Sequence, residues 1–357
     1  MRVGILTFPK SPSHGCSLQM FALYKTLQSM GVEAEIISYS PPHLIHNKVK
    51  KERSVKKRIS ALAYKLLVKS AEPSFAKFES QLTSYPSRVA TTSDELKEIA
   101  QRYDRIVVGS DQVWNPAITD GDLNYYLEFS SLYERNASYA PSFGIDEVVD
   151  KKESITALLK NIKYLSVREE QGRKIVEDLT GRRVPIVLDP TMLLPIEEWK
   201  KQEIIGHKFN KPYVLYYTIK NSTKLRKYAE KFAESNGCIL VTVGGRIKDK
   251  FDSKKHPAFG VGPGELLSLI NNAAYVITNS FHGTVFSVLY NKKFKVEYSS
   301  DTNSRLINLV KILGLENCVA DVEDTSYKVP ELDYNSVGEK LKKEREESLN
   351  FLKTIVE

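Results

Sequence analysis

The segment "VITNSFHGTVFSVLY", residues 276–290, passes from one kind of secondary structure to another without a loop between them. An apolar run ends at Thr278, and a helical pattern of apolar residues begins at Phe281. A strand followed directly by a helix is typical of a parallel α/β sheet. Such sheets bind ligands beyond the carboxyl ends of their strands, so the junction "NSFHG" lies where functional groups are expected.

The rest of the chain repeats this alternation in two series. The first series runs from "RVGILTF", residues 2–8, to "PIVLDP", residues 185–190, and includes "YLSVRE", residues 164–169, as a further strand. The second series begins at "PYVLYYTI", residues 212–219, after a polar stretch without strand character. Alternating strands and helices predict parallel sheets with right-handed crossovers.

We therefore predict the α/β class, with two doubly wound Rossmann-like domains that face each other across a cleft. A length of 357 residues suits two domains of ordinary size. The predicted divisions are an N-terminal domain of residues 1–195, a C-terminal domain of residues 196–330 and a charged amphipathic helix of residues 331–357.

The positive charge of the chain is concentrated in one segment. The formal net charge is +8, and residues 48–69 alone hold nine Lys or Arg and one Glu. The remaining charges balance, which excludes a uniformly basic nucleic-acid-binding protein. An apolar stripe at helical spacing runs through the segment. Two interpretations stay open: a helix on an anionic membrane surface, or a surface helix whose stripe packs on its own domain.

The composition predicts a soluble protein of the cytoplasm, associated with the inner face of the plasma membrane if residues 48–69 bind lipid. Hydrophobic residues make up 41% of the chain, and no apolar run approaches the ~20 residues of a membrane-spanning helix. The N-terminus has too short an apolar core for a signal peptide. Three separated cysteines and six scattered histidines show no zinc-type spacing, so neither a metal nor a cofactor is expected.

The junction "NSFHG" has the features of an anion site. The first N–H groups of a helix have no partner within the helix, and the helix dipole makes this end positive. Ser280 is a candidate helix cap, Gly283 would let an anion approach the backbone, and His282 is suited to donate a hydrogen bond or a proton. Asn279 and Thr284 complete the predicted substrate-binding turn. The structural alternative is a plain helix cap beside a surface histidine.

A second motif, "SVREEQG", ends a predicted strand with an arginine. Glu169 and Glu170 suit the positive start of the following helix, where a cation is disfavoured. Arg168 is therefore a candidate clamp for a carboxylate or phosphate, which its planar guanidinium matches. An ion pair with Glu169 or another neighbour is the alternative.

Two other strand ends, "GSDQVWNP" and "VGGR", contribute weaker candidates. The first combines turn-forming residues with an indole, which either stacks on a sugar ring or anchors the loop in the core. The second offers two glycines where a ligand would approach the backbone. The candidate substrate-binding residues at these ends are Ser110, Asp111, Trp114, Asn115, Gly244 and Gly245.

Together these motifs resemble the polysaccharide pyruvyl transferase family. The resemblance rests, in order from about residue 3 to 315, on "GILTF", "HGCSLQMFALYKTLQSMG", "IVVGSDQVWNP", "ASYAPSFG", "LSVREEQG", "VLDPTMLL", "GPGELLSLINNAAYVITNSFHGTVFSVLYNKKF" and "SRLINLVKILGL". It implies a glycosyltransferase-B-like arrangement of the two domains. It also implies that a pyruvyl group moves from phosphoenolpyruvate to a sugar of a cell-surface polysaccharide or its precursor (an exopolysaccharide, capsule or cell-wall glycan). The product would be a ketal that bridges two hydroxyls.

The resemblance also implies residue roles. The family's histidine in "SFHG" corresponds to His282, and its arginine in "SVRE" corresponds to Arg168. Phosphoenolpyruvate is then the donor, a glycan or lipid-linked oligosaccharide is the acceptor, and no metal is required. Arg305 is either a further donor ligand or part of a plain helix start.

Two other functions remain as alternatives. The first is a glycosyltransferase that uses a nucleotide-sugar donor in the same architecture. The second is a glycan-binding module without catalysis, against which His282 and Arg168 argue.

Overall fold

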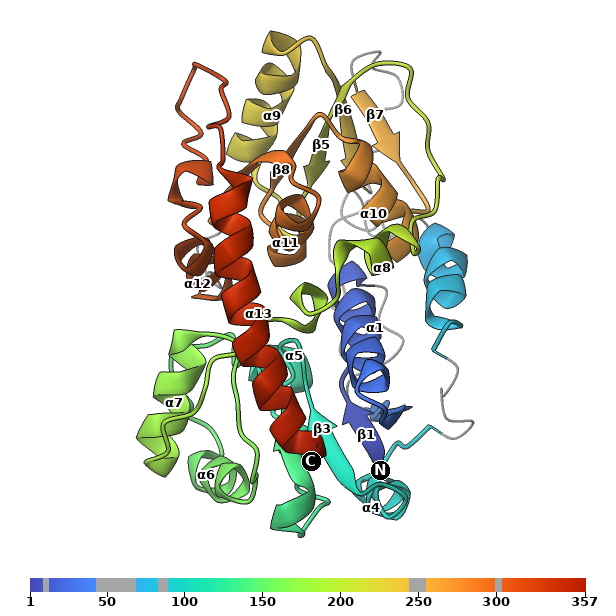
Figure 1. Ribbon diagram of the computed structural model, residues 1–357, viewed down its shortest axis with the longest axis vertical. Helices are drawn as coiled ribbons and strands as arrows, with labels where there is room; N and C mark the ends of the chain where they lie inside the picture. Colours follow the sequence, from blue (N-terminus) through green and yellow to red (C-terminus); the bar gives the residue numbers. More distant parts are fainter. Residues whose placement is uncertain (9–12, 43–68, 83–88, 244–254, 299–303) are drawn as a thin grey trace, which may run out of the picture. The chain divides into compact units, whose positions relative to one another are not determined.

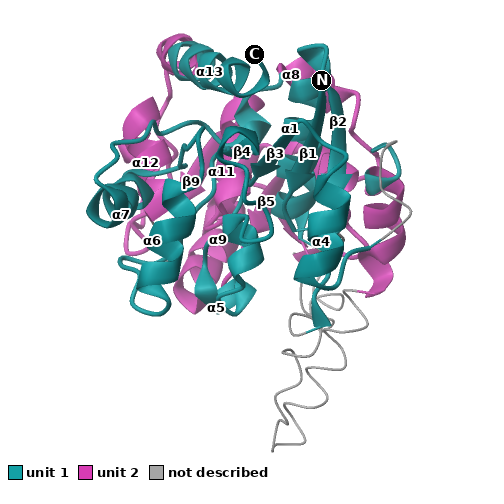
Figure 2. Cartoon of the chain, turned by 90° about the horizontal axis from the view of Figure 1, so that it is seen from below, with its two compact units in different colours: residues 1–51, 79–194, 342–357 teal, residues 52–78, 195–341 magenta. Residues whose placement is uncertain are grey.

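The computed structural model describes residues 1–8, 13–42, 69–82, 89–243, 255–298 and 304–357 (Figure 1). The chain divides into two compact units (Figure 2). Unit 1 consists of residues 1–51, 79–194 and 342–357, and unit 2 of residues 52–78 and 195–341. None of the helices within the described ranges is long and apolar enough to span a bilayer.

Unit 1 contains a parallel sheet with the strand order β2-β1-β3-β4, and its parallel pairing confirms the prediction. The strands are β1 Arg2–Leu6, β2 Glu33–Ile37, β3 Arg105–Val108 and β4 Asn136–Ser138. The helices are α1 His14–Ser29, α4 Ser93–Ala100, α5 Pro116–Thr119, α6 Lys152–Lys160 and α7 Glu170–Thr180. Short 3-10 turns are η1 Leu123–Tyr126, η2 Tyr133–Arg135 and η3 Pro190–Met192.

Two segments of the first series that were predicted as strands are not strands in the structure. Residues 164–169 and 185–190 form only isolated bridges, one of them between Val167 and Ile186. The backbone N–H groups of Ser166 and Leu188 donate to the side-chain hydroxyls of Ser138 and Ser348, so a regular backbone ladder does not continue past these bridges. The second segment ends instead in the η3 turn.

Unit 2 contains a parallel sheet with the strand order β7-β6-β5-β8-β9. The strands are β5 Tyr213–Tyr217, β6 Ile239–Val243, β7 Lys255–Ala258, β8 Tyr275–Thr278 and β9 Lys293–Val296. The helices are α8 Ile196–Lys200, α9 Thr223–Ser235, α10 Pro263–Asn272, α11 Phe281–Leu289 and α12 Ser304–Leu313, with the 3-10 turn η5 Glu316–Cys318. The long helix α13 Tyr334–Val356 begins in unit 2, and its residues from 342 onward belong to unit 1.

Each sheet reverses its strand order once, and this reversal locates the candidate sites. In unit 2, β6 and β7 extend the sheet on one side of β5, whereas β8 and β9 extend it on the other. In unit 1, β2 lies on one side of β1, and β3 and β4 lie on the other. Open α/β sheets bind ligands at this switch point, beyond the carboxyl ends of the two strands that flank it. The positions to examine are therefore the ends of β5 and β8, and those of β1 and β3.

Candidate functional site

The turn after β8 lies at the switch point of unit 2 and is tied to the neighbouring strand β5. Asn279 accepts a hydrogen bond from Ile219 N at 2.9 Å through Oδ1 and donates one to Lys220 O at 2.9 Å through Nδ2. Thr278 Oγ1 donates to Tyr217 O at 2.5 Å. The chain that leaves β5 and the chain that leaves β8 are therefore fixed to each other.

The same turn starts helix α11, and Ser280 is its cap, as predicted. Ser280 Oγ accepts a hydrogen bond from Gly283 N at 3.2 Å, and Thr284 Oγ1 donates to Ser280 O at 3.0 Å. The first turn of α11 holds no acidic residue, so no carboxylate within it offsets the positive end of the helix dipole. This helix end therefore keeps its attraction for an anion.

His282 lies in this first turn, with 5% of its surface exposed. Its ring meets the Phe281 ring edge to face, with the centroids 5.2 Å apart and the planes at 87°. The guanidinium of Arg305, from the first turn of α12, lies 5.9 Å from the centroid of the same Phe281 ring. The structure thus brings His282 and Arg305 to one aromatic ring, beside Ser280 and Asn279.

Gly283 serves the packing of α11 against the sheet. A Cβ atom at this position would lie 2.4 Å from Thr278 Oγ1 and 3.0 Å from Tyr217 Cδ1. Glycine is therefore required because the helix starts directly against the ends of β8 and β5. The close approach that the sequence suggested at Gly283 is an approach between two segments of the protein.

Arg168 is buried in unit 1, with 3% of its surface exposed. Its Nε donates to Ala140 O at 3.2 Å, and its Nη2 donates to Ser110 Oγ and lies 3.1 Å from Asp189 Oδ2. The ion-pair interpretation of Arg168 therefore has a structural basis, with Asp189 as the partner in place of Glu169. The guanidinium joins the chain segments that follow β3 and β4 to the segment before η3.

Sequence reasoning did not identify Asp189 as part of this cluster. Besides its ion pair, its Oδ1 accepts hydrogen bonds from Thr191 N at 2.9 Å and from Thr191 Oγ1 at 2.6 Å. Burial and the nearby Asp189 carboxylate raise the pKa of Tyr139 well above its ordinary value, so this phenol stays neutral. The sequence did hold a signal, because the carboxylate of "VLDP" follows an apolar run. A carboxylate buried there needs a cationic partner, since a buried charge without one is destabilising.

The loop after β3 is built into the core of unit 1. Trp114 is completely buried, its ring stacks on Tyr126 at a centroid distance of 5.3 Å, and its Nε1 donates to Tyr125 O at 2.7 Å. The indole therefore anchors the loop in the core and offers no face to a sugar. Asn115 caps α5 by accepting a hydrogen bond from Ala117 N at 3.0 Å.

Ser110 and Asp111 connect the same loop to its neighbours. Ser110 N donates to Gln19 Oε1 at 3.1 Å, and Ser110 Oγ donates to Ala140 O at 2.9 Å. Asp111 Oδ2 accepts a hydrogen bond from Cys16 Sγ at 3.1 Å, and its φ of 72° lies in the left-handed region that few residues other than glycine adopt. These contacts join the end of β3 to α1 and to the chain after β4.

Some of the predicted residues lie outside the described residues. These are Gly244, Gly245 and all of the basic segment except Lys69. Across the described ranges, no group of three or more His, Cys, Asp or Glu side chains is arranged to hold a metal ion.

One family model matches most of the chain. It is described as polysaccharide pyruvyl transferase and matches residues 14–295, which include the motifs of Arg168 and His282. No curated protein matches the chain in sequence.

Two solved structures show the same fold. A protein from Listeria monocytogenes, assigned as a UDP-N-acetylglucosamine 2-epimerase, has a TM-score of 0.52 at 10% identity, over 98% of this chain and 90% of that chain. The UDP-GlcNAc 2-epimerase from Neisseria meningitidis has a TM-score of 0.50 at 9% identity, over 99% of this chain and 94% of that chain. At such identities the similarity concerns the fold alone. It confirms the predicted class of two Rossmann-like units in a glycosyltransferase-B-like fold.

Proposed function

The chain belongs to the polysaccharide pyruvyl transferase family, and we propose that it moves the pyruvyl group of phosphoenolpyruvate onto two hydroxyls of one sugar, as a ketal. The sugar belongs to a cell-surface polysaccharide or its precursor. The observation that carries this proposal is the start of α11, a capped helix end with His282 in its first turn, at the switch point of unit 2. Such an end combines an anion site with an imidazole.

In this proposal, the donor phosphate lies at the N-terminus of α11. The helix dipole and the first-turn N–H groups favour a phosphate there. Arg305 supplies a positive charge for the donor carboxylate, and its contact with Phe281 supports this role. Asn279 and Ser280 shape the turn, because their side chains are already engaged with backbone atoms of the protein.

The proposed reaction combines two acceptor hydroxyls with the donor and releases inorganic phosphate. C3 of the donor takes up a proton and becomes a methyl group while an acceptor oxygen bonds to C2. The bond between C2 and the phosphate oxygen then breaks, and the second hydroxyl oxygen closes the ketal. One hydroxyl proton is thus retained in the methyl group, and the other leaves with the phosphate.

His282 is the proposed acid of this reaction. An imidazolium beside the phosphate stabilises the charge that grows on the leaving group and delivers a proton, directly or through a phosphate oxygen. The protons released by the acceptor hydroxyls restore the charged imidazole for the next turnover. No metal or further cofactor enters the proposal.

Unit 1 is proposed to bind the acceptor. Arg168 is proposed to act there as a positioning residue, because its hydrogen bond to Ser110 and its ion pair with Asp189 hold the edge formed by the ends of β3 and β4. The motif alone suggested that Arg168 contacts phosphoenolpyruvate directly, and the positioning role is proposed in place of that contact.

The proposed location is the cytoplasm, with contact to an anionic membrane or a lipid-linked acceptor through residues 48–69. Nine Lys or Arg in this segment support such contact, since each basic residue near an anionic surface contributes ~1 kcal/mol. This contact is tested by neutralising Lys50, Lys51, Lys56 and Lys57 and comparing the binding of the variant and the wild type to anionic vesicles.

The proposed function is tested by incubating the protein with phosphoenolpyruvate and an acceptor glycan. Mass spectrometry is expected to find a pyruvyl ketal on the glycan, with one phosphate released for each ketal formed. Phosphoenolpyruvate is also expected to raise the melting temperature, because a ligand that binds only the folded state stabilises it. Stabilisation by a nucleotide sugar, with no phosphate released from phosphoenolpyruvate, would support the glycosyltransferase alternative instead.

A further inference from the structure

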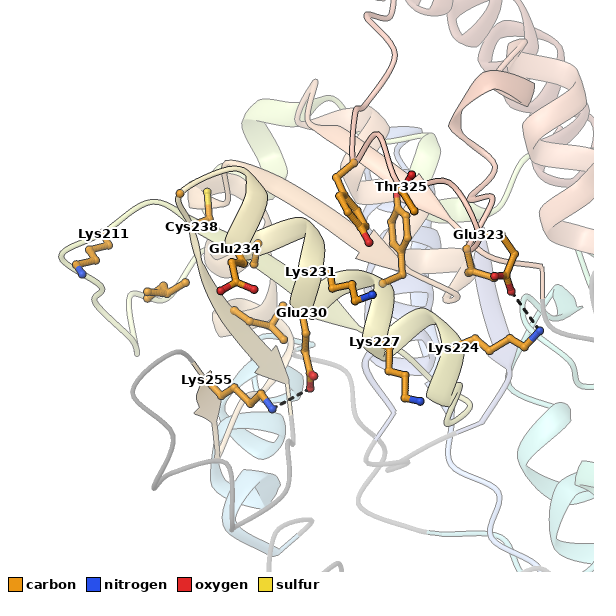
Figure 3. Close-up of a pocket in the computed structure, with 17 residues that line it drawn as sticks. Lys211, Lys224, Lys227, Glu230, Lys231, Glu234, Cys238, Lys255, Glu323 and Thr325 are labelled. Atoms are coloured by element: carbon orange, nitrogen blue, oxygen red, sulfur yellow. Dashed lines mark hydrogen bonds and ion pairs between the residues drawn. The ribbon is translucent and has the colours of Figure 1, made fainter.

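A pocket of unit 2 lies apart from the α11 turn. It has a volume of about 970 Å³ and is lined by α9, by the amino end of β6 and by the loop of residues 322–327 (Figure 3). The strands of this sheet are parallel, so the amino end of β6 and the carboxyl end of β8 lie at opposite edges of the sheet. The pocket is therefore distinct from the site proposed for the donor.

Three lysines give one wall of the pocket a positive charge. Lys224, Lys227 and Lys231 rise from successive turns of α9 (Figure 3). Their spacing puts them on one face of the helix together with Tyr228. Lys224 lies 3.5 Å from Glu323 of the loop. Within the parts of the chain that the structure describes, Lys227 and Lys231 have no ion-pair partner.

The acidic residues near these lysines are largely engaged elsewhere. Asp321 accepts a hydrogen bond from a backbone N–H of its own loop at 3.0 Å, and Asp324 accepts two from Ser326 at 2.8 Å each. Glu230 lies 3.1 Å from each of two neighbouring cations. Glu234 lies toward Cys238, at the end of the pocket away from Lys224 (Figure 3). Since none of these carboxylates forms an ion pair with Lys227 or Lys231 in the described part of the chain, the two ammonium groups are available to a ligand.

Tyr228 adds a hydrogen-bond donor to the same wall. The residue is 3% exposed, and its buried hydroxyl has no hydrogen-bond partner among the described residues. Burial raises the pKa of Tyr228 to about 12, so the phenol keeps its proton at neutral pH. Its ring lies beside that of Tyr327, with the centroids 5.6 Å apart. A buried hydroxyl without a partner is destabilising, and an acceptor oxygen of a ligand would satisfy it.

We infer that this pocket binds a carboxylate-bearing stretch of the glycan chain, with Lys227 and Lys231 at a carboxylate and the Tyr228 hydroxyl at a sugar or carboxylate oxygen. The inference rests on the proposed function, since a pyruvylated polysaccharide carries a carboxylate on each modified sugar. Ammonium groups suit carboxylates, and tyrosine rings with a polar tip suit the mixed faces of a sugar. The pocket would hold a modified part of the polymer while another sugar occupies the reaction site.

The inference is tested by binding without phosphoenolpyruvate, with polygalacturonate as the carboxylate-bearing glycan and dextran as the neutral one. The wild type is expected to bind polygalacturonate and not dextran. Lys227→Ser combined with Lys231→Ser is expected to weaken this binding about tenfold or more, as for the loss of one or two charge-assisted contacts. Tyr228→Phe is expected to weaken it several-fold without lowering the stability of the fold, because the hydroxyl has no protein partner to lose.

The matched control is Lys160→Ser combined with Lys174→Ser, which removes two exposed helical lysines from unit 1. This variant is expected to bind polygalacturonate with the affinity of the wild type, since the binding depends on the lysines of the pocket and not on the net charge of the protein. An equal loss in both double variants, undiminished binding by Tyr228→Phe, or displacement of polygalacturonate by millimolar inorganic phosphate would overturn the inference. Pyruvyl transfer by the wild type to a short acceptor is measured separately. Its absence would refute the proposed function while the binding results still decide on the pocket.

Discussion

The turn before α11 in unit 2 and the cluster around Arg168 in unit 1 both lie at the carboxyl edge of a parallel sheet, yet they use their polar atoms differently. Arg168 is buried and directs its guanidinium at a protein carbonyl, a hydroxyl and the Asp189 carboxylate. The α11 turn uses its polar side chains to build a helix end that no first-turn carboxylate neutralises. A motif at a strand end therefore indicates a switch point. Whether the charged groups of such a motif stabilise the fold or bind a ligand depends on whether other segments of the protein supply partners for them.

His282→Ala tests whether the α11 turn acts on a ligand. General acid catalysis contributes typically ~10²–10⁴-fold in rate, so kcat is expected to fall by about that range. The fold should survive, because Ser280 and Asn279 hold the turn without the imidazole. Phosphate release from phosphoenolpyruvate measures the rate, and urea denaturation measures the free energy of unfolding.

His282→Asn is the matched variant for the proton. An amide donates hydrogen bonds but supplies no proton, so this variant is expected to be as slow as His282→Ala. A near-normal kcat in His282→Asn would show that the histidine only positions the phosphate, and the acid would then have to be another group.

Arg168→Met tests whether the Arg168 cluster of unit 1 stabilises the fold. It keeps much of the side-chain volume but leaves the Asp189 carboxylate buried without its cation, and breaking such a pair costs about 3–5 kcal/mol. Urea denaturation is expected to show this loss in free energy of unfolding. Arg173→Met is the control: it removes an ion pair with the exposed Glu170 side chain, and such a pair contributes only ~0–1 kcal/mol. A variant of Arg168 that unfolds like the wild type but no longer binds phosphoenolpyruvate would make the arginine a donor ligand and remove the contrast between the two regions.

The same contrast explains how far the sequence alone reaches. Local pattern was enough for the parallel sheets, for the strand-to-helix junction at "NSFHG" and for the Ser280 cap, because each depends on residues adjacent in the chain. The Arg168–Asp189 pair and the burial of Trp114 were not determined by pattern, because each depends on contacts between separate segments. Apolar content alone also predicted a strand at residues 185–190, which form only an isolated bridge because the Leu188 N–H donates to a side-chain hydroxyl and the chain then turns into η3.

Gly283→Ala measures how tightly the α11 turn is built. A methyl group there would lie 2.4 Å from Thr278 Oγ1, and overpacking of this kind costs typically ~1–3 kcal/mol. The free energy of unfolding is expected to fall by about that amount. Gly338→Ala in α13 is the control, because nothing lies within 4 Å of its added methyl group and alanine stabilises a helix by up to ~1 kcal/mol relative to glycine. Equal gains in both variants would show that α11 has room to shift and that the turn is not fixed.

Ser280→Ala has the smallest expected effect and separates capping from ligand binding. The hydroxyl is completely buried and accepts the Gly283 N–H, so its loss should lower the free energy of unfolding by ~1 kcal/mol, as for other helix caps. Ser287→Ala, on the same helix, removes a hydroxyl that bonds to the Gly283 carbonyl in mid-helix, where alanine is the better helix former, and should be nearly neutral. Because the Ser280 hydroxyl faces the protein, the KM for phosphoenolpyruvate is expected to stay within about twofold of the wild type, well below the tenfold that a lost contact of ~1.4 kcal/mol would cause. A much larger rise in KM, at unchanged stability, would show that Ser280 contacts the donor itself, and the α11 turn would then bind its ligand through side chains as well as through the helix end.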